Sequence, residues 1–406
     1  MNRKILLSAA LISTTLLATA QQSGKTYAIT GKQNNKFFWA DIKEVDIATG
    51  KVVKTLFDAD KTAFKSVNFD TPKGMQYQQE GSPTAYGVAA CAFDARFNRL
   101  YFAPMHFSEI RYLDLAKEGA NFVTVKRNVI QAPANGYQSE ENHITRMVIA
   151  ADGFGYAITN DANHLIRFTT GKKTQVEDLG NIIDAESNKG LSIHNKCSSW
   201  GGDMVADAFG KLIIVSANHN VFSVDVHSRI ATFTGTISGL PPAYTTNGAV
   251  VDQEGNLVVS SANVFDGLYR VNIKDLKAVK IESNETPFNA SDLANGNFLS
   301  QKEKDALTKF DLVKPTPVAV GGSSVYPNPV TGNQFNVLFD NLKLGRYTIL
   351  LTDLAGRVLQ SKVATIVSPK QIENVRLFNK VSKGMYLVKV LDEKGQLSFS
   401  DKVVIE

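Results

Sequence analysis

One pattern of hydrophobic and polar positions recurs along most of the chain. It consists of an apolar strand, a turn with Asp or Gly, a second apolar strand, a polar loop and a third strand. Its copies begin, in order, at Lys25, Gly87, Arg146, Asp203, Gly248 and Ser291. The second strands are marked by Tyr101, Tyr156, Leu212, Leu257 and Phe298. Successive markers lie 55, 56, 45 and 41 positions apart. This period is typical of the blades of a β-propeller.

The first and last copies indicate how such a ring would close. The copy at Lys25 lacks its opening strand and the copy at Ser291 is cut short, so strands from both ends can complete one blade and leave few exposed edges. We expect five or six blades over residues 21–313, six being preferred. An open pair of β-sandwiches is the alternative, although a sandwich does not require one pattern to repeat at this period.

A different pattern follows the propeller. Residues 314–324 contain two prolines, two glycines and small side chains, which marks a linker. Residues 325–406 then alternate over about seven short strands separated by Gly, Asp and Asn turns, enough for a small immunoglobulin-like β-sandwich. The whole chain is therefore predicted to be all-β.

Three motifs occur in order along residues 325–406. They comprise Tyr326, Pro327, Asn328 and Pro329, then Asp353, Gly356 and Arg357, and finally Gly384, Met385 and Tyr386. With these motifs the segment resembles the type A sorting domain of the type IX secretion system. The resemblance implies a cargo protein of a Gram-negative bacterium, recognised by the secretion machinery, trimmed in the linker by a sortase-like protease, and either released or attached to the cell surface.

The amino terminus predicts export. Arg3 and Lys4 precede an apolar run that ends in the small-x-small site Ala18 to Ala20, so residues 1–20 are expected to be a cleaved signal peptide. The chain of 406 residues carries a net charge of +5. Residues 1–20 contribute +2 and residues 325–406 contribute +4, which leaves the propeller near neutral. Neither a nucleic-acid partner nor a transmembrane segment in the mature protein is expected.

The two cysteines are Cys91 and Cys197. An exported chain allows one disulfide between them. However, Cys91 lies in the apolar run "GVAACAF", where a buried free thiol that behaves as a small hydrophobic side chain is favoured.

Candidate functional residues come from the loops before each first strand, because these loops converge at the channel mouth of a propeller. They include Tyr86, Arg146 and Asp292 as rim residues. Asp203 and Asn247 are similar to the metal ligands of calcium-dependent gluconolactonase-type propellers, with Glu80 as a third candidate, and oxygen ligands suit Ca²⁺. The alternative is that Asp203 and Asn247 bind turn backbone, as Asx side chains commonly do.

Trp200 lies beside two glycines in "SSWGGD". It can stack on a sugar or peptide at the rim or pack between blades. The chain has no HExxH or GxSxG motif, and no catalytic residue is assigned. We therefore expect a secreted or cell-surface binding module for a glycan or protein, with a calcium-dependent lactonase-like hydrolase as the alternative.

Overall fold

The computed structural model describes residues 24–70, 81–131, 135–171, 174–312, 323–340, 342–354, 356–378 and 381–406. It divides into two compact units, Met1–Lys304 and Asp305–Glu406. The expected signal peptide and Glu80 lie outside the described residues. No helix in the described part is long and apolar enough to cross a membrane.

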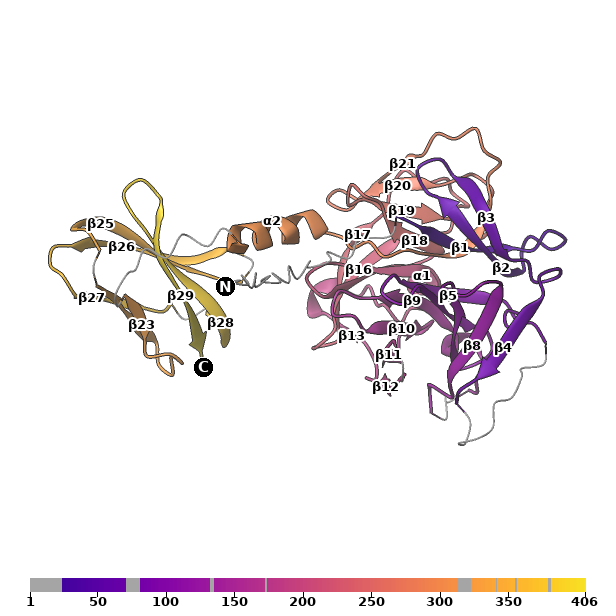
Figure 1. The fold of residues 1–406 in the computed structure, drawn as a ribbon, viewed down its shortest axis with the longest axis horizontal. Coiled ribbons are helices and arrows are strands. Elements are labelled where there is room, and N and C mark those ends of the chain that lie inside the picture. The colour runs from indigo at the N-terminus through magenta and orange to yellow at the C-terminus, as the bar shows by residue number, and fades with distance from the viewer. Residues whose placement is uncertain are drawn as a thin grey trace, which may run out of the picture. The chain divides into compact units, whose positions relative to one another are not determined.

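The first unit contains five sheets of four or five strands within its described residues (Figure 1). From the inner strand outward, the first consists of β22 (Ala290–Ala294), β1 (Thr26–Gly31), β2 (Trp39–Asp46) and β3 (Lys51–Phe57). The second has β5 (Val88–Asp94), β6 (Arg99–Pro104), β7 (Glu109–Asp114), β8 (Ala120–Arg127) and β4 (Phe64–Asn68). The third has β9 (Ile144–Ile149), β10 (Gly155–Thr159), β11 (Leu165–Phe168) and β12 (Val176–Asp178). The fourth has β14 (Asp203–Ala206), β15 (Lys211–Val215), β16 (Asn220–Asp225), β17 (Ile230–Thr236) and β13 (Ile183–Asp184). The fifth has β18 (Gly248–Val251), β19 (Leu257–Ser260), β20 (Tyr269–Asn272) and β21 (Lys277–Lys280).

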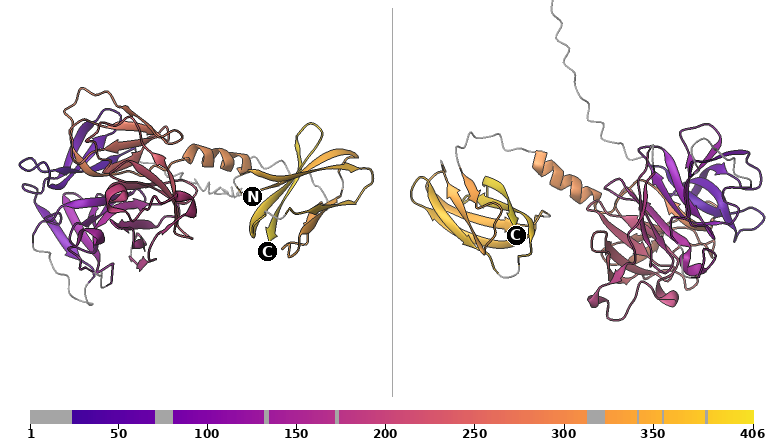
Figure 2. Two further views of the ribbon diagram at one scale, coloured as in Figure 1. Left: turned by 180° about the vertical axis from the view of Figure 1, so that it is seen from behind. Right: turned by 90° about the horizontal axis from the view of Figure 1, so that it is seen from below.

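These sheets are the blades of a propeller, because each inner strand packs against the inner strands of two neighbouring blades and the series returns to its start. Closure uses β22, which pairs antiparallel with β1 and places Tyr27 opposite Ala294. The first strands, in indigo, therefore lie beside the last strands of the ring, in orange (Figures 1 and 2). The partial copies at Lys25 and Ser291 form one blade. The preferred count of six treated them as two blades; the described strands form five.

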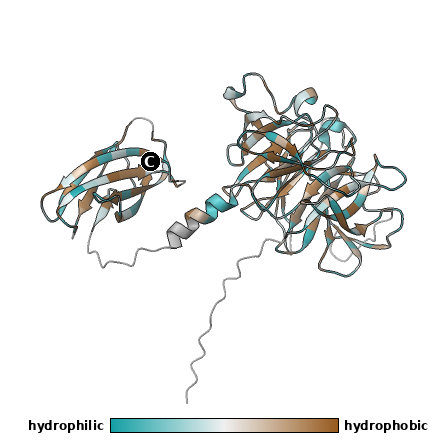
Figure 3. Cartoon of the chain, turned by 90° about the horizontal axis from the view of Figure 1, so that it is seen from above, coloured by the Kyte–Doolittle hydropathy of each residue, from teal (hydrophilic) through white to brown (hydrophobic). Residues whose placement is uncertain are grey.

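Local sequence explains the hairpins and the packing between blades. Asp152 Oδ1 accepts the Phe154 amide at 2.9 Å, and Gly153 adopts φ +85° in the same turn, a conformation that favours glycine. Between the second and third blades, the buried rings of Tyr101 and Phe168 lie 5.4 Å apart. Hydrophobic residues, coloured brown, are concentrated on the strands (Figure 3). Burial of these strand faces supplies the main stabilisation of the ring.

Four short helical segments occur among the described residues, and the last of them spans the boundary between the two units. They are the 3₁₀ turns Glu140–Asn142 and Glu186–Asn188, α1 (Lys196–Ser199) and α2 (Gln301–Leu312). The helix α2 was not expected, since residues up to 313 were assigned to the strands and loops of the propeller. Of its described side chains, those of residues 302–306 are exposed, and those of Gln301 and Leu307 are half-buried.

The second unit is the predicted β-sandwich. One sheet has β23 (Ser324–Tyr326), β24 (Gln334–Phe339) and β27 (Gln371–Arg376), and the other has β26 (Val358–Ile366), β25 (Gly345–Thr352), β28 (Gly384–Leu391) and β29 (Leu397–Ile405). Alternate residues of both sheets fill one core that includes Phe335, Ile349, Val388 and Val403. Ser324 begins the first strand, so it belongs to this sandwich and not to the linker. The all-β prediction is confirmed.

Candidate functional site

The strands of each blade alternate in direction. The loop before the inner strand and the loop between the second and third strands therefore leave from the same end of a blade. We call this end of the propeller the top face and the opposite end the bottom face. Asn289, which precedes β22, donates from Nδ2 to the carbonyls of Lys36 at 2.5 Å and Ala262 at 3.0 Å. Lys36 and Ala262 lie in second-to-third strand loops of the first and fifth blades, so the top-face loops contact one another.

Arg146 lies inside the ring and not on the rim that the sequence analysis expected. Its side chain is fully buried. The guanidinium donates to the carbonyls of Ser199 at 2.6 Å, Gly201 at 2.7 and 3.1 Å, and Thr159 at 3.3 Å. Burial lowers the pKa of Arg146 to about 10, which leaves the group charged at neutral pH. Arg146 therefore anchors the loop that carries Trp200.

Asp203 and Asp292 also lie on the axis of the ring and have no exposed surface. The Asp203 carboxylate accepts the amides of Met204 and Ala249, both at 2.6 Å, and of Leu293. It thus joins three inner strands, β14, β18 and β22. Burial raises the pKa of Asp203, but these amides and Arg146 favour its charged form.

Asp292 has a different environment. Its Oδ1 accepts the Cys91 thiol at 2.9 Å, while its Oδ2 is buried without a hydrogen-bond partner. Burial and the nearby Asp203 raise the pKa of Asp292 well above its usual range. We therefore assign the proton of this carboxyl pair to Asp292. Like Arg146, Asp292 was expected on the rim and instead lies in the interior.

Asn247 does not share a hydrogen-bond partner with Asp203. Its Oδ1 accepts the Ala262 amide at 3.2 Å, within its own blade, as the backbone-binding alternative describes. No group of three or more His, Cys, Asp or Glu side chains that could hold a metal occurs within the described residues. A calcium ion bound by Asp203 would have to displace its amide donors. Asp203 and Asn247 are thus better placed to join backbone segments through hydrogen bonds than to bind a metal together.

Tyr86 and Trp200 are found on top-face loops. Tyr86 is 54% exposed and lies edge to face with Phe107, 4.8 Å between centroids. Its segment is anchored by Arg111, which donates to the Pro83 carbonyl at 2.6 Å. Trp200 is half-buried; its indole donates to the His194 carbonyl at 2.9 Å. Tyr86 is thus available to a ligand, whereas Trp200 is partly committed to its own loop.

Sequence reasoning missed two further aromatics of the top face. Phe37 is 59% exposed and Phe265 is 39% exposed. Their rings lie 6.3 Å apart at 72°, although the residues come from blades at opposite ends of the repeat. A large apolar residue inside each of the polar loops "KQNNKFF" and "ANVFDG" was the available signal.

The cysteines are both free. Cys91 is buried and Cys197 is exposed, so the favoured expectation of a buried free thiol at Cys91 holds and the disulfide is absent. His143, His164, His194 and His219 contact backbone carbonyls or a carboxylate, whereas His106 packs its ring against His143. His164 Nδ1, for example, lies 2.6 Å from Asp178 Oδ2.

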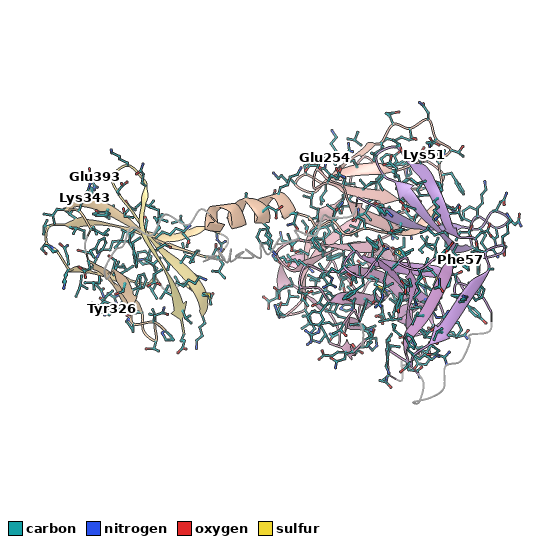
Figure 4. The ribbon with its side chains drawn as sticks, in the orientation of Figure 1. Lys51, Phe57, Glu254, Tyr326, Lys343 and Glu393 are labelled. Atoms are coloured by element: carbon teal, nitrogen blue, oxygen red, sulfur yellow. The ribbon has the colours of Figure 1, made fainter. Side chains whose placement is uncertain are left out.

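In the second unit, the expected sorting residues stabilise turns and a strand edge. Asn328 donates to the Lys402 carbonyl at 2.7 Å and accepts the Val404 amide at 2.9 Å. Asp353 and Arg357 close a hairpin through bonds of 2.9 and 3.1 Å, in which Gly356 has φ +81°. These residues shape the sandwich, while Tyr326, labelled in Figure 4, is 38% exposed.

Strand β28 carries the remaining motif. Gly384, Met385 and Tyr386 open this strand and pair with the end of β29, Ile405 to Val403. The Tyr386 hydroxyl donates to the Ser382 carbonyl at 2.5 Å, and Met385 is 48% exposed. The motif therefore combines a tyrosine ring that stabilises the fold with one exposed methionine side chain. Of the first motif, Pro327 and Pro329 lie in the segment that leads from β23 to β24.

Comparison with known proteins identifies the second unit. Residues 324–406 match the secretion system C-terminal sorting domain. The chain therefore carries the tail of proteins that the type IX secretion system exports to the cell surface or the extracellular space.

Solved structures similar to the chain show low identities. PorZ, a surface component of the type IX secretion system of Porphyromonas gingivalis, is 16% identical over 91% of this chain and 50% of its own, with a TM-score of 0.32. This chain thus spans half the length of PorZ. A streptogramin B lyase is 12% identical over 65% of this chain and 85% of its own, with a TM-score of 0.34. Virginiamycin B lyase from Staphylococcus aureus is 10% identical over 95% of this chain and 96% of its own, with a TM-score of 0.32. With TM-scores this low, these similarities do not bear on the activity of the chain. No curated protein sequence matches it.

Proposed function

We propose that the propeller is a binding module whose extracellular ligand, a glycan or a protein, contacts the top face. One observation carries this proposal. Phe37, Tyr86 and Phe265 expose 59, 54 and 39% of their surface on top-face loops of three blades, and those loops are anchored by Arg111 and Asn289. Exposed aromatics on rigid loops lose little entropy on binding and are common anchors of interfaces.

Export supplies the context for this role. A signal peptide at residues 1–20 would direct the chain to the periplasm, and residues 325–406 would then present it to the secretion machinery of the outer membrane. Trimming by a sortase-like protease within residues 314–323 would separate the two units. Deletion of residues 325–406, followed by fractionation of cells and medium, tests the tail. Retention in the periplasm is expected, and continued appearance outside the cell would refute the role of the tail.

Ligand binding is tested with the secreted full chain on paired glycan and extracellular-protein arrays. Replacing Tyr86 with Ala should weaken any specific signal about tenfold, the effect of losing a 1.4 kcal/mol contact. Phe209 is the matched control, since it is 48% exposed in the β14–β15 turn of the bottom face. A signal that falls equally in Phe209→Ala would place the ligand elsewhere. The absence of a signal on both arrays would refute the binding role.

A further inference from the structure

One part of the top face combines exposed apolar rings with a cation. It consists of Lys36, Phe37 and Phe265, which we call the clasped platform. Lys36 and Phe37 lie in the β1–β2 loop, and Phe265 lies in the β19–β20 loop. The two rings contact edge to face, and both remain substantially exposed. Phenylalanine rings have no polar end that water could satisfy, so their exposure as a pair marks a surface that a partner covers.

The platform is held in shape by hydrogen bonds within and between its two loops. Asn289 is 3% exposed and donates to the carbonyls of both loops, at Lys36 and Ala262. The Phe37 amide binds Asn35 Oδ1 at 3.3 Å, and the Phe38 amide binds the Asn35 carbonyl at 3.0 Å. A side chain at Gly31 would meet the Lys36 carbonyl at 1.9 Å. The rings are therefore displayed by a preorganised backbone.

The charges around the platform leave one cation available. The Lys36 ammonium lies 5.1 Å from the centre of the Phe265 ring. Asp266, beside that ring, is bound to Lys280 at 2.6 Å and also accepts the Tyr269 hydroxyl. On the first blade, the nearby lysines Lys32 and Lys61 pair with Asp60 and Asp58. Among the described residues, no carboxylate forms an ion pair with Lys36.

We propose that the clasped platform binds an acidic peptide segment, in which an apolar side chain stands next to a carboxylate. The apolar side chain would contact Phe37 and the edge of Phe265, and the carboxylate would pair with Lys36. A peptide fits better than a sugar ring because Lys36 lies over a face of Phe265 and the Phe37 ring meets Phe265 edge to face, so the two rings do not form one flat stacking surface. This inference rests on the proposed binding function and names the ligand class of one part of the same face.

The test uses the full chain and three synthetic peptides on a biosensor. The acidic probe is acetyl-Gly-Asp-Leu-Glu-Phe-Gly-amide, the neutral probe replaces Asp and Glu with Asn and Gln, and the basic probe replaces both with Lys. The acidic probe should bind at least about tenfold more tightly than the neutral one, and its affinity should fall with added salt. Equal affinity for the acidic and neutral probes would overturn the proposal.

Variants locate the contact. Lys36→Glu and Phe37→Ala should each reduce affinity for the acidic probe by about tenfold or more. Lys51→Glu, a change of the same charge at an exposed lysine where β3 begins (Figure 4), should leave it within about twofold. Equal losses in Lys36→Glu and Lys51→Glu would overturn the proposal. Binding of glycans with no peptide binding would overturn the peptide assignment and leave the binding function intact, whereas no binding of either class would refute both.

Discussion

The buried guanidinium of Arg146 offers the sharpest test of how the top face is built. Arg146→Met keeps most of the apolar stem but removes the donors to Ser199, Gly201 and Thr159. Hydrogen bonds from a charged group contribute about 1.5–3 kcal/mol each, and part of that gain offsets the cost of burying the charge. The variant also leaves the buried carboxylate of Asp203 without its nearby cation. Removing one member of such a buried charge network costs about 3–5 kcal/mol.

Urea unfolding of the full chain measures this loss. The two tryptophans, Trp39 and Trp200, both lie in the propeller, so their fluorescence reports on that unit. With a slope near 3 kcal/mol/M, the midpoint for Arg146→Met should fall by about 1–2 M. The signal from Trp200 is expected to respond most directly, because Arg146 binds the carbonyls on either side of it.

Arg167→Met is the control for loss of an arginine in the same blade. Arg167 pairs with Glu177 at 2.6 Å, but both side chains are exposed, and such surface pairs contribute at most about 1 kcal/mol. Its midpoint should stay close to that of the wild-type chain. If both variants shift the midpoint equally, or if Arg146→Met shifts it by less than about 0.3 M, the anchoring role of Arg146 is wrong.

Three further predictions concern protons and thiols. Asp292→Asn should change how stability depends on pH. Burial and Asp203 raise the pKa of Asp292 in the folded chain, so the free energy of unfolding of the wild-type chain should fall as the pH rises above about 4, and the variant should lack this decrease. Melting temperatures of the two chains that change in parallel with pH would contradict the assignment. His164→Gln should lower the free energy of unfolding by at most about 1 kcal/mol at pH 6 and leave it unchanged at pH 9. Asp178 raises the pKa of His164, so the stabilisation by this ion pair is lost as the pH rises through that pKa. An equal loss of stability at both pH values would refute this. Thiol titration should find one reactive group, Cys197, in the native chain and two in concentrated urea, because Cys91 is buried and its pKa is raised. Two reactive groups in the native chain would show that the reagent reaches Cys91 and would contradict its burial.

The position of a residue in the sequence indicated which strand it belongs to, but not which way its side chain points. The sequence analysis placed Arg146, Asp203 and Asp292 in the loops just before inner strands. Asp203 is the first residue of β14, but Arg146 and Asp292 lie at the third positions of β9 and β22. Whether each side chain points to solvent or to the axis depends on the pleat of the strand and on its neighbours. Arg146 and Asp292 turn inward and are fully buried. One residue of shift along a strand reverses this direction, and the spacing of the repeats does not define positions to that accuracy.

The sequence by itself determined the all-β class, the repeat period, the change of pattern after the linker and the sorting domain, because each depends on local periodicity or on motifs contiguous in the chain. Tertiary structure decided the blade count, since only the pairing of β22 with β1 shows that two partial copies form one blade. It also decided the composition of the clasped platform, in which Phe37 and Phe265 come from blades that meet only when the ring closes. Closure brings together residues more than two hundred positions apart, and a linear pattern carries no signal for such a contact.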